Sequence, residues 1–140
     1  MDKDIQVGYS FEKVCKFTGS ELREMARACG DMNFIHHDLE AAKRTRFKNL
    51  IGSGSAITGY FSALIPTHFT TIAPILGLEM TQKFLAPIFP DTTLSMKWQV
   101  NNIHTKSNND LIVELYGSIT DENEVICISS TASILLVDKM

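Results

Sequence analysis

Residues 52–66, "GSGSAITGYFSALIP", predict a helix that is buried on most of its circumference. Apolar side chains recur around the whole 3.6-residue turn. They are Ala56, Ile57, Tyr60, Phe61, Leu64 and Ile65. Pro66 marks the expected end, since proline removes a hydrogen bond and clashes with the preceding turn. A glycine inside a helix costs about 1 kcal/mol relative to alanine, so Gly52, Gly54 and Gly59 suggest that other groups approach this backbone closely.

Upstream of this helix, the sequence predicts a strand and two short helices. Apolar residues alternate with polar ones over residues 9–17, which is typical of a strand. "TGSE" then forms a capping box, with Thr18 as the N-cap and Glu21 three residues further on, at the start of an amphipathic helix. Gly30 ends that helix, as a glycine just past the last turn commonly does. A second, brief helical turn is expected after Asp38, a favourable N-cap residue.

Downstream, the hydrophobic period changes to two, which predicts about four antiparallel strands. The alternation is clearest over residues 94–100, 111–115 and 126–136, and turn-forming segments separate these runs. The fold class is therefore α+β, with an antiparallel sheet packed on one long apolar helix. One flat sheet cannot cover a helix that is apolar on nearly all sides. We therefore expect the sheet to curve around the helix or a second copy to cover the remainder, and we predict a homodimer.

Size and composition are those of a single-domain globular protein. The 140 residues are 44% hydrophobic and 21% charged, which fits one domain over residues 1–140. A net charge of -3 argues against nucleic-acid binding, which usually shows a basic excess. Residues 56–78 are fairly apolar, but two prolines and a histidine argue against a membrane-spanning helix. The polar N-terminus and three cysteines without a CxxC spacing favour a cytoplasmic protein with reduced thiols.

Asp31 and His36 are the first candidates for chemistry. Their side chains meet only if the chain turns between them, and Gly30 and Asn33 both favour turns. A carboxylate and an imidazole that meet can hold a water molecule and exchange its protons. The alternative, which the spacing alone favours, is a turn-forming aspartate and a partly buried core histidine. Adjacent histidines usually point apart, and no third ligand follows His37 at a suitable spacing, so no metal site is predicted.

The start of the predicted long helix offers a second kind of site. "GSGS" lacks the GxGxxG and P-loop spacings of nucleotide-binding loops. Its glycines instead leave free N–H groups at the positive end of the helix dipole, which favours a developing oxyanion. Ser62, further along, is either bonded back to a carbonyl of its own helix or aimed at a polar group in a pocket. The basic run "KRTRFK", residues 43–48, is typical of a solvated surface; beside a pocket, its Lys43 and Arg44 would attract phosphates.

Together these residues resemble a known family. "GDMNFIH", residues 30–36, is similar to the GDxNPxH hydratase motif of the MaoC-like (R)-specific enoyl-CoA hydratases. The downstream "TRFKNLIGSG", the buried helix and "QKFLAPIFPDT" also fall where this family has them, so the resemblance covers nearly the whole chain. It implies the hotdog fold, in which a curved antiparallel sheet is wrapped around one long central helix, here Gly54 to Ile65, and it implies a homodimer.

The resemblance also implies a reaction and the residues that carry it. Asp31 and His36 would activate one water for the reversible hydration of trans-2-enoyl-CoA to (R)-3-hydroxyacyl-CoA, and no metal or redox cofactor is needed. The N–H of Gly54 would hold the thioester oxygen as it gains enolate character. Asn33 would shape the turn, and Ser62 would lie near the catalytic pair. Neighbouring interpretations are a dehydratase acting on acyl-carrier-protein thioesters, an acyl-CoA thioesterase and a non-catalytic acyl-CoA-binding module.

The sequence departs from the family pattern at three positions. Phe34 replaces the motif proline, and Ser53 replaces the histidine that commonly precedes the helix glycine. Pro90 replaces a glycine, with the following Asp91 kept. None of these changes removes a catalytic atom, but Phe34 is expected to make the turn less rigid and to alter the shape of the pocket.

Overall fold

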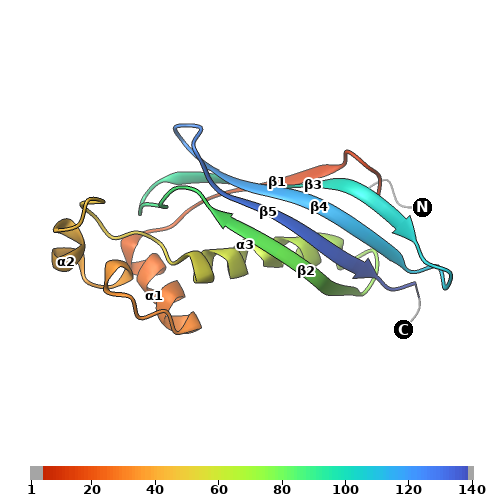
Figure 1. The fold of residues 1–140 in the computed structure, drawn as a ribbon, viewed down its shortest axis with the longest axis horizontal. Helices are drawn as coiled ribbons and strands as arrows, with labels where there is room; N and C mark the ends of the chain where they lie inside the picture. The colour runs from red at the N-terminus through yellow and green to blue at the C-terminus, as the bar shows by residue number, and fades with distance from the viewer. Residues whose placement is uncertain (1–4, 139–140) are drawn as a thin grey trace.

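A five-stranded antiparallel sheet curves around a central helix in the computed structural model, which describes residues 5–138 (Figure 1). The elements in chain order are β1 (Ser10–Lys16), α1 (Gly19–Cys29), the 3-10 helix η1 (Phe34–His36), α2 (Leu39–Lys43), α3 (Gly54–Phe69), β2 (Ile75–Phe84), β3 (Thr93–Thr105), β4 (Leu111–Asp121) and β5 (Ile126–Leu136). The strand order is β1-β3-β4-β5-β2, so β1 and β2 form the two edges of the sheet. The predicted α+β class, with a curved sheet around one long helix, is confirmed.

The core lies between the sheet and α3 (Figure 1). Alternate residues of β3 point inward, as the period of two predicted, and Trp98 is fully buried among them. The ring of Trp98 stacks on Phe61 of α3 with centroids 4.4 Å apart, and its Nε1–H donates to the main-chain oxygen of Phe61, 3.0 Å away. Gly117 lies opposite Trp98 on β4, where an added Cβ would collide with the indole ring. This pair of aromatic residues fixes the middle of α3 against the sheet.

Helix α3 runs further than predicted, to Phe69, and Pro66 lies inside it. A proline inside a helix removes one hydrogen bond and costs about 3 kcal/mol. The last turn forms because Phe69 is buried and packs edge-on against Phe11 of β1, with ring centroids 5.5 Å apart. Burying a phenylalanine contributes about 1.5–3 kcal/mol and an edge-on aromatic pair about 0.5–1.5 kcal/mol more, so tertiary packing offsets the local stop signal. Across residues 5–138, no helix is both long and apolar enough to cross a membrane.

The three glycines of this region differ in their surroundings. A Cβ on Gly52 would collide with Ile57, and a Cβ on Gly54 would collide with the ring of Phe84, which confirms the close approach expected there. By contrast, a Cβ added at Gly59 would meet nothing of the described chain within 4 Å beyond the backbone of its own helix. Part of α3 is exposed and carries small side chains at successive turns. This small-residue face consists of Ser55, Gly59 and Ala63.

Short helices at one end of the sheet position the loop between α1 and α3. Thr18 and Glu21 form the predicted capping box at the start of α1, with hydrogen bonds of 3.1 and 2.9 Å between each side chain and the N–H of the other residue. Gly30 ends α1 in the left-handed conformation, at φ 83°. Asp38 caps α2, also as predicted. These local signals determine where the segment that follows α1 begins.

Candidate active site

Asp31 and His36 meet because the chain turns between them. Asp31 follows Gly30 directly, and its Oδ1 accepts a hydrogen bond from the N–H of Asn33, 3.2 Å away. The side chain of Asn33 then accepts a hydrogen bond from the N–H of Ile35 and starts η1, which ends at His36. Aspartate and asparagine favour such bonds to nearby backbone in turns. The predicted turn is present, and Asn33 shapes it.

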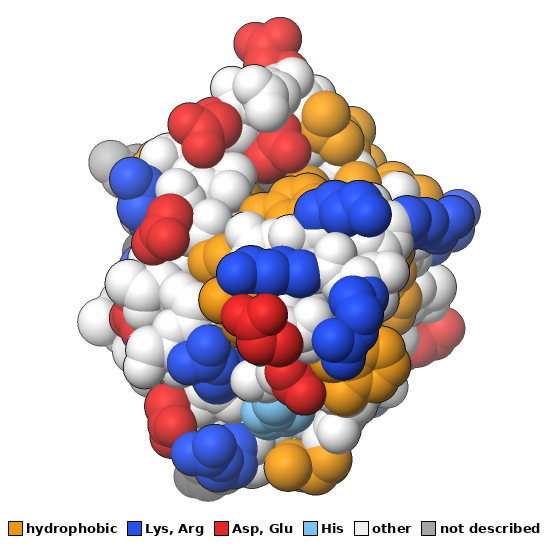
Figure 2. Space-filling model, turned by 90° about the vertical axis from the view of Figure 1, so that its left-hand side faces the viewer, with side chains coloured by type: hydrophobic (Ala, Val, Ile, Leu, Met, Phe, Trp, Pro, Cys, Tyr) orange, Lys and Arg blue, Asp and Glu red, His pale blue; other side chains and the backbone are white. Residues whose placement is uncertain are grey.

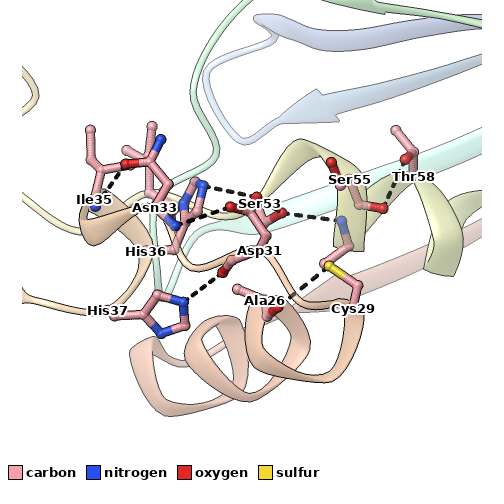
Figure 3. Close-up of polar contacts among 12 residues, drawn as sticks. Ala26, Cys29, Asp31, Asn33, Ile35, His36, His37, Ser53, Ser55 and Thr58 are labelled. Carbon is pink, nitrogen blue, oxygen red and sulfur yellow. Dashed lines mark hydrogen bonds and ion pairs between the residues drawn. The ribbon is translucent and has the colours of Figure 1, made fainter.

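The carboxylate of Asp31 faces the imidazole of His36 (Figure 3), with Oδ2 and Nε2 3.2 Å apart. His36 is 6% exposed, whereas the side chain of Asp31 is 24% exposed. Nδ1 of His36 lies 2.8 Å from the main-chain oxygen of Ile51. A carbonyl oxygen only accepts hydrogen bonds, so Nδ1 carries the hydrogen and Nε2 is the nitrogen left for proton exchange. The structure thus brings the two predicted residues together through one specific ring nitrogen.

His37 points away from His36 and supports the same loop (Figure 3). Its Nε2 donates a hydrogen bond to the main-chain oxygen of Asp31, 2.7 Å away. The centroids of the two histidine rings are 6.4 Å apart, and the rings are inclined at 74°, as expected of neighbouring histidines. Among residues 5–138, no group of three or more histidine, cysteine, aspartate or glutamate side chains is placed to hold a metal ion.

Ser53 is a site residue that the sequence did not predict. It is 1% exposed, and its hydroxyl donates to Oδ2 of Asp31 across 2.5 Å (Figure 3). Its Oγ also accepts a hydrogen bond from the N–H of Ala56 at 3.3 Å and so caps α3. A serine just before a helix is a recognisable capping signal. The contact with Asp31 joins residues 22 positions apart, which no local pattern reveals.

The surroundings of Asp31 favour its ionised form. The hydrogen bond from Ser53 lowers the pKa of the carboxyl group, partial burial opposes this by raising it, and the N–H of Asn33 lowers it further. The neighbouring His36 and His37 lower it by smaller amounts. The resulting pKa lies below 3.8, the ordinary value for aspartate. Asp31 is therefore a carboxylate at neutral pH, able to accept hydrogen bonds and to stabilise a neighbouring cation.

A cavity of about 460 Å³ opens beside His36 and Gly54, the first residue of α3. Much of its wall is apolar, and the residues there include Phe47, Phe84, Leu85, Pro87, Ile88 and Ile128. The first N–H groups of a helix have no partner within that helix and carry the positive end of its dipole. The imidazole and the positive end of α3 therefore border one cavity, whose size is in the range of ordinary small-molecule sites.

The other predicted residues have partners of their own. Ser62 donates a hydrogen bond to the main-chain oxygen of Gly59, 3.0 Å away, which is the back-bonded alternative of the two considered. Lys43 pairs on the surface with Glu40, with Nζ and Oε1 3.4 Å apart. Arg44 is the C-cap of α2. Neither Lys43 nor Arg44 lines the cavity.

Arg46, from the same basic run, does line the cavity. Its guanidinium group lies over the ring of Phe47, 5.0 Å from the ring centroid. Figure 2 shows that Lys and Arg side chains are interspersed with Asp and Glu side chains on the end of the molecule that carries α1 and α2. Arg46 is thus the member of the basic run that is placed to contact a bound ligand.

Two departures from the family pattern leave the local backbone intact. Phe34 begins η1 and is 51% exposed, and the contacts of Asn33 hold the turn there. Pro90 precedes Asp91, which adopts a left-handed conformation at φ 58°. The N–H of Asp91 donates to the main-chain oxygen of Phe17, 2.7 Å away. The turn before β3 is therefore formed without a glycine.

Comparison with known proteins agrees with this architecture. The family model described as "MaoC like domain" matches residues 2–122. A mitochondrial 3-hydroxyacyl-[acyl-carrier-protein] dehydratase from Arabidopsis thaliana is 20% identical over 132 residues, which cover 94% of this chain and 78% of that protein.

Solved structures share the fold over almost the whole chain. The (R)-hydratase from A. caviae involved in PHA biosynthesis is similar with a TM-score of 0.85 at 20% identity, covering 97% of this chain and 100% of that one. A MaoC-like dehydratase from Rhodospirillum rubrum is similar with a TM-score of 0.81 at 20% identity, covering 99% of this chain and 97% of that one. The fold is thus the hotdog fold that the resemblance implied. Because the family model spans most of its length, the chain belongs to the MaoC-like dehydratase family.

Proposed function

We propose that the protein is a hydro-lyase that interconverts trans-2-enoyl-CoA and (R)-3-hydroxyacyl-CoA. The observation that carries this proposal is the contact between Oδ2 of Asp31 and Nε2 of His36 beside a cavity that also borders Gly54. Similar proteins are named as a hydratase and as dehydratases, and adding or removing water are the two directions of one reaction.

The geometry of the pair suits the handling of one water molecule. Oδ2 and Nε2 are only 3.2 Å apart, so one oxygen atom can lie at about 2.8 Å, a hydrogen-bond distance, from both. In the hydration direction, this oxygen bonds to C3 of the enoyl thioester while the pair accepts one of its protons. The electrons of the C2–C3 double bond move toward the thioester carbonyl and form an enolate. A proton returned from the pair to C2 completes the product.

His36 and Asp31 have different roles in the proposed proton transfer, and their surroundings determine which role each takes. His36 keeps the hydrogen on Nδ1 bonded to Ile51, so Nε2 takes and returns the proton. Asp31, whose pKa is lowered, stays ionised, orients the water and stabilises the imidazolium that forms. Asn33 supports the pair by holding the turn between them.

The start of α3 supplies the electrostatic part of the mechanism. The thioester oxygen gains negative charge as the enolate forms, and the N–H of Gly54 and the positive end of the helix dipole stabilise that charge. One such donor typically contributes about 100- to 1000-fold to turnover. Ser62, further along the same helix, donates to the main-chain oxygen of Gly59 and does not line the cavity, so it has no part in this electrostatic contribution.

Basic residues near the cavity are proposed to contact the phosphates of coenzyme A. Arg46 lines the cavity, and Lys43 and Arg44 precede it in the same run. Neutral substitutions of these residues should raise KM for the CoA thioester with little change in kcat, because the phosphates are remote from the reacting atoms. Unchanged KM after neutralising Lys43 and Arg44 would remove those two from the proposal.

A dehydratase acting on acyl-carrier-protein thioesters is the second candidate. The observation that favours it is the relative from A. thaliana, whose name gives that class of substrate. The proposed chemistry at Asp31 and His36 would be the same, and only the carrier of the acyl group would differ.

Purified protein mixed with crotonyl-CoA and longer trans-2-enoyl-CoA substrates tests the proposal. Hydration removes the ultraviolet absorbance of the conjugated thioester without releasing a thiol, and the product should be the (R) enantiomer. Thiol release would indicate a thioesterase. Activity confined to acyl-carrier-protein thioesters would indicate the second candidate, and no turnover with any of these substrates would favour a non-catalytic acyl-CoA-binding module.

The proposed functional unit is a homodimer. Strand β2 is an edge strand of ten residues that pairs only with β5 among the described strands, and it exposes Leu76 and Leu78. A long apolar edge strand is a template for pairing with another chain. The small-residue face of α3 gives a second copy close access to the helix, and a Cβ added at Gly59 would meet nothing among the described residues within 4 Å beyond the backbone of α3 itself.

A further inference from the structure

We propose that Ser53 is a positioning residue for this reaction, because its hydroxyl holds the carboxylate of Asp31 in the orientation that faces His36. The proposal rests on the function proposed above, in which Asp31 and His36 handle one water. Ser53 lies outside the hydratase motif, residues 30–36, and stands where the family pattern commonly has histidine. The role that we propose for Ser53 therefore rests on its hydrogen bonds in this structure and not on the family pattern.

The hydroxyl of Ser53 has one direction available for its hydrogen. The residue is 1% exposed, so bulk solvent does not compete for it. The N–H of Ala56 donates to Oγ at 3.3 Å, which occupies a lone pair and leaves the O–H to point at Oδ2 of Asp31, 2.5 Å away. A hydroxyl that donates to an ionised carboxylate forms a charge-assisted bond, which is about twice as strong as a bond between neutral groups. Ser53 is therefore a fixed donor to the carboxylate.

This bond restrains the carboxylate oxygen that meets the imidazole. Oδ2 of Asp31 contacts both Ser53 and Nε2 of His36, whereas Oδ1 is held by the N–H of Asn33. The terminal torsion of aspartate is broad, so a carboxylate anchored only at Oδ1 can rotate Oδ2 away from His36. Losing the hydroxyl also removes the largest contribution that lowers the pKa of Asp31.

One short piece of backbone determines the whole arrangement. The carbonyl of Ile51 fixes the tautomer of His36, Ser53 holds Asp31, and Gly54 begins α3. Because Ser53 is also the N-cap, one oxygen atom joins the start of the helix to the carboxylate. The placement of the proton-transfer pair relative to the N–H of Gly54 therefore depends on this atom.

The competing explanation is that Ser53 only caps α3. Glycine is nearly as good an N-cap as serine, whereas alanine costs about 1 kcal/mol. Ser53→Gly therefore deletes the hydroxyl with little loss of the cap, and Ser53→Ala loses both. Ser53→Cys keeps the shape with a weaker donor, and Ser53→Thr keeps the hydroxyl. Thr18→Ala is the matched control, because Thr18 caps α1 by the same kind of bond, to the N–H of Glu21.

Two measurements on these variants decide between the explanations. The first is the pH dependence of kcat and KM for enoyl-CoA hydration, and the second is the titration of the Asp31 carboxyl carbon by NMR. We expect Ser53→Gly and Ser53→Ala to lower kcat about 10- to 100-fold, to change KM less than about threefold, and to raise the titration midpoint of Asp31. Because the mechanism needs an ionised Asp31, the part of the acidic limb of kcat that reports protonation of Asp31 should move to higher pH.

The remaining variants calibrate this result. Ser53→Cys should be intermediate, Ser53→Thr should restore most of the kcat, and Thr18→Ala should leave both kcat and the Asp31 midpoint as in the wild type. Should Ser53→Gly and Ser53→Ala fail to fold, the comparison of Ser53→Cys with Ser53→Thr decides in the same way. An unchanged Asp31 midpoint, or a loss of kcat that only follows the loss of thermal stability, overturns the proposal.

The NMR titration needs no substrate, so the two proposals can fail separately. If the wild-type protein hydrates no enoyl thioester but the midpoint still rises in Ser53→Gly, the proposed function fails while the hold of Ser53 on Asp31 stands. If the wild type is active and the midpoint does not move, the proposed function stands and Ser53 is only a helix cap.

Discussion

Nδ1 of His36 lies 2.8 Å from the main-chain oxygen of Ile51, and this one bond determines which ring nitrogen meets Asp31. The loop before α3 thereby fixes the tautomer of a residue 15 positions earlier in the chain. In the proposed mechanism, proton transfer at Nε2 needs no rearrangement of the ring, because the hydrogen on Nδ1 remains bonded throughout.

We expect Asp31→Asn and His36→Ala each to lower kcat for enoyl-CoA hydration at least about 100-fold, the usual loss for a general acid or base. His104→Ala is a matched control, because His104 is exposed on β3 and contacts Glu114 of the neighbouring strand β4. That variant should keep full turnover in the same absorbance assay. Near-normal kcat in both site variants would instead mean that other residues carry the reaction.

Comparing Gly54→Pro with Gly54→Ala distinguishes the effect of losing the N–H of Gly54 from the effect of adding a side chain at this position. Proline is favoured at the first position of a helix, and Ser53 has the extended conformation that a following proline needs, at φ -70° and ψ 120°. Both substitutions place a Cβ against Phe84, but only proline removes the N–H. We expect kcat of the proline variant to be about 100- to 1000-fold below that of the alanine variant. Equal kcat values would mean that this N–H does not stabilise the enolate.

The stability that the Asp31 carboxylate contributes should be lost in acid. Its native pKa is lowered, so the charged form stabilises the fold above the ordinary value of 3.8, and this contribution disappears as pH falls through the native pKa. The difference in unfolding free energy between the wild type and Asp31→Asn should therefore be largest near neutral pH and should shrink in acid. Denaturant titrations at a series of pH values measure it, and a difference that does not vary with pH would contradict the expectation.

Gly117→Ala should lower the free energy of unfolding by about 1–3 kcal/mol, the usual cost of overpacking a core. An added Cβ would meet the ring of Trp98, which is fully buried and bonded to Phe61. Gly77→Ala on β2 is the matched control, because nothing lies within 4 Å of a Cβ added there. It should change the stability by less than about 0.5 kcal/mol. Equal effects in denaturant unfolding would show that the indole ring can move aside.

Light scattering tests the proposed homodimer. We expect a dimeric wild type, and we expect Leu78→Lys to shift the protein toward monomer, because a lysine on an edge strand opposes pairing. Leu78 is 51% exposed on β2. Val125→Lys, at a 43% exposed position in the turn between β4 and β5, is the control and should leave the mass unchanged. A monodisperse wild-type monomer would reject the dimer.

Most of the fold could be predicted from the sequence because its signals are local. The capping box at Thr18, the glycine stop at Gly30 and the alternation in the later strands each depend on residues within a few positions, and each is confirmed. The predicted helix end at Pro66 was wrong, because the packing of Phe69 on Phe11 joins segments far apart in the chain. No pattern near Pro66 carries that information.

In the candidate site, too, the local contacts could be predicted from the sequence and the long-range contacts could not. The meeting of Asp31 and His36 follows from a turn that Asn33 builds within its own neighbourhood. The contacts that orient the pair come from a second loop, through Ile51 and Ser53, at separations of 15 and 22 residues. Such contacts require the loop before α3 to lie against the turn after α1, and only the folded chain reveals this.

The apolar cavity wall at residues 84–88 has a consequence for enzyme engineering. This segment begins at Phe84, the last residue of β2, and its backbone is anchored by two 2.8 Å hydrogen bonds, from Leu85 N–H to the Cys127 oxygen and from Gly52 N–H to the Ile88 oxygen. Both bonds use main-chain atoms, so a mutant library can vary the side chains without cutting either anchor. Under the proposed function, selection for acyl-tail length can therefore act on these side chains while the turn that carries Asp31 and His36 keeps its sequence.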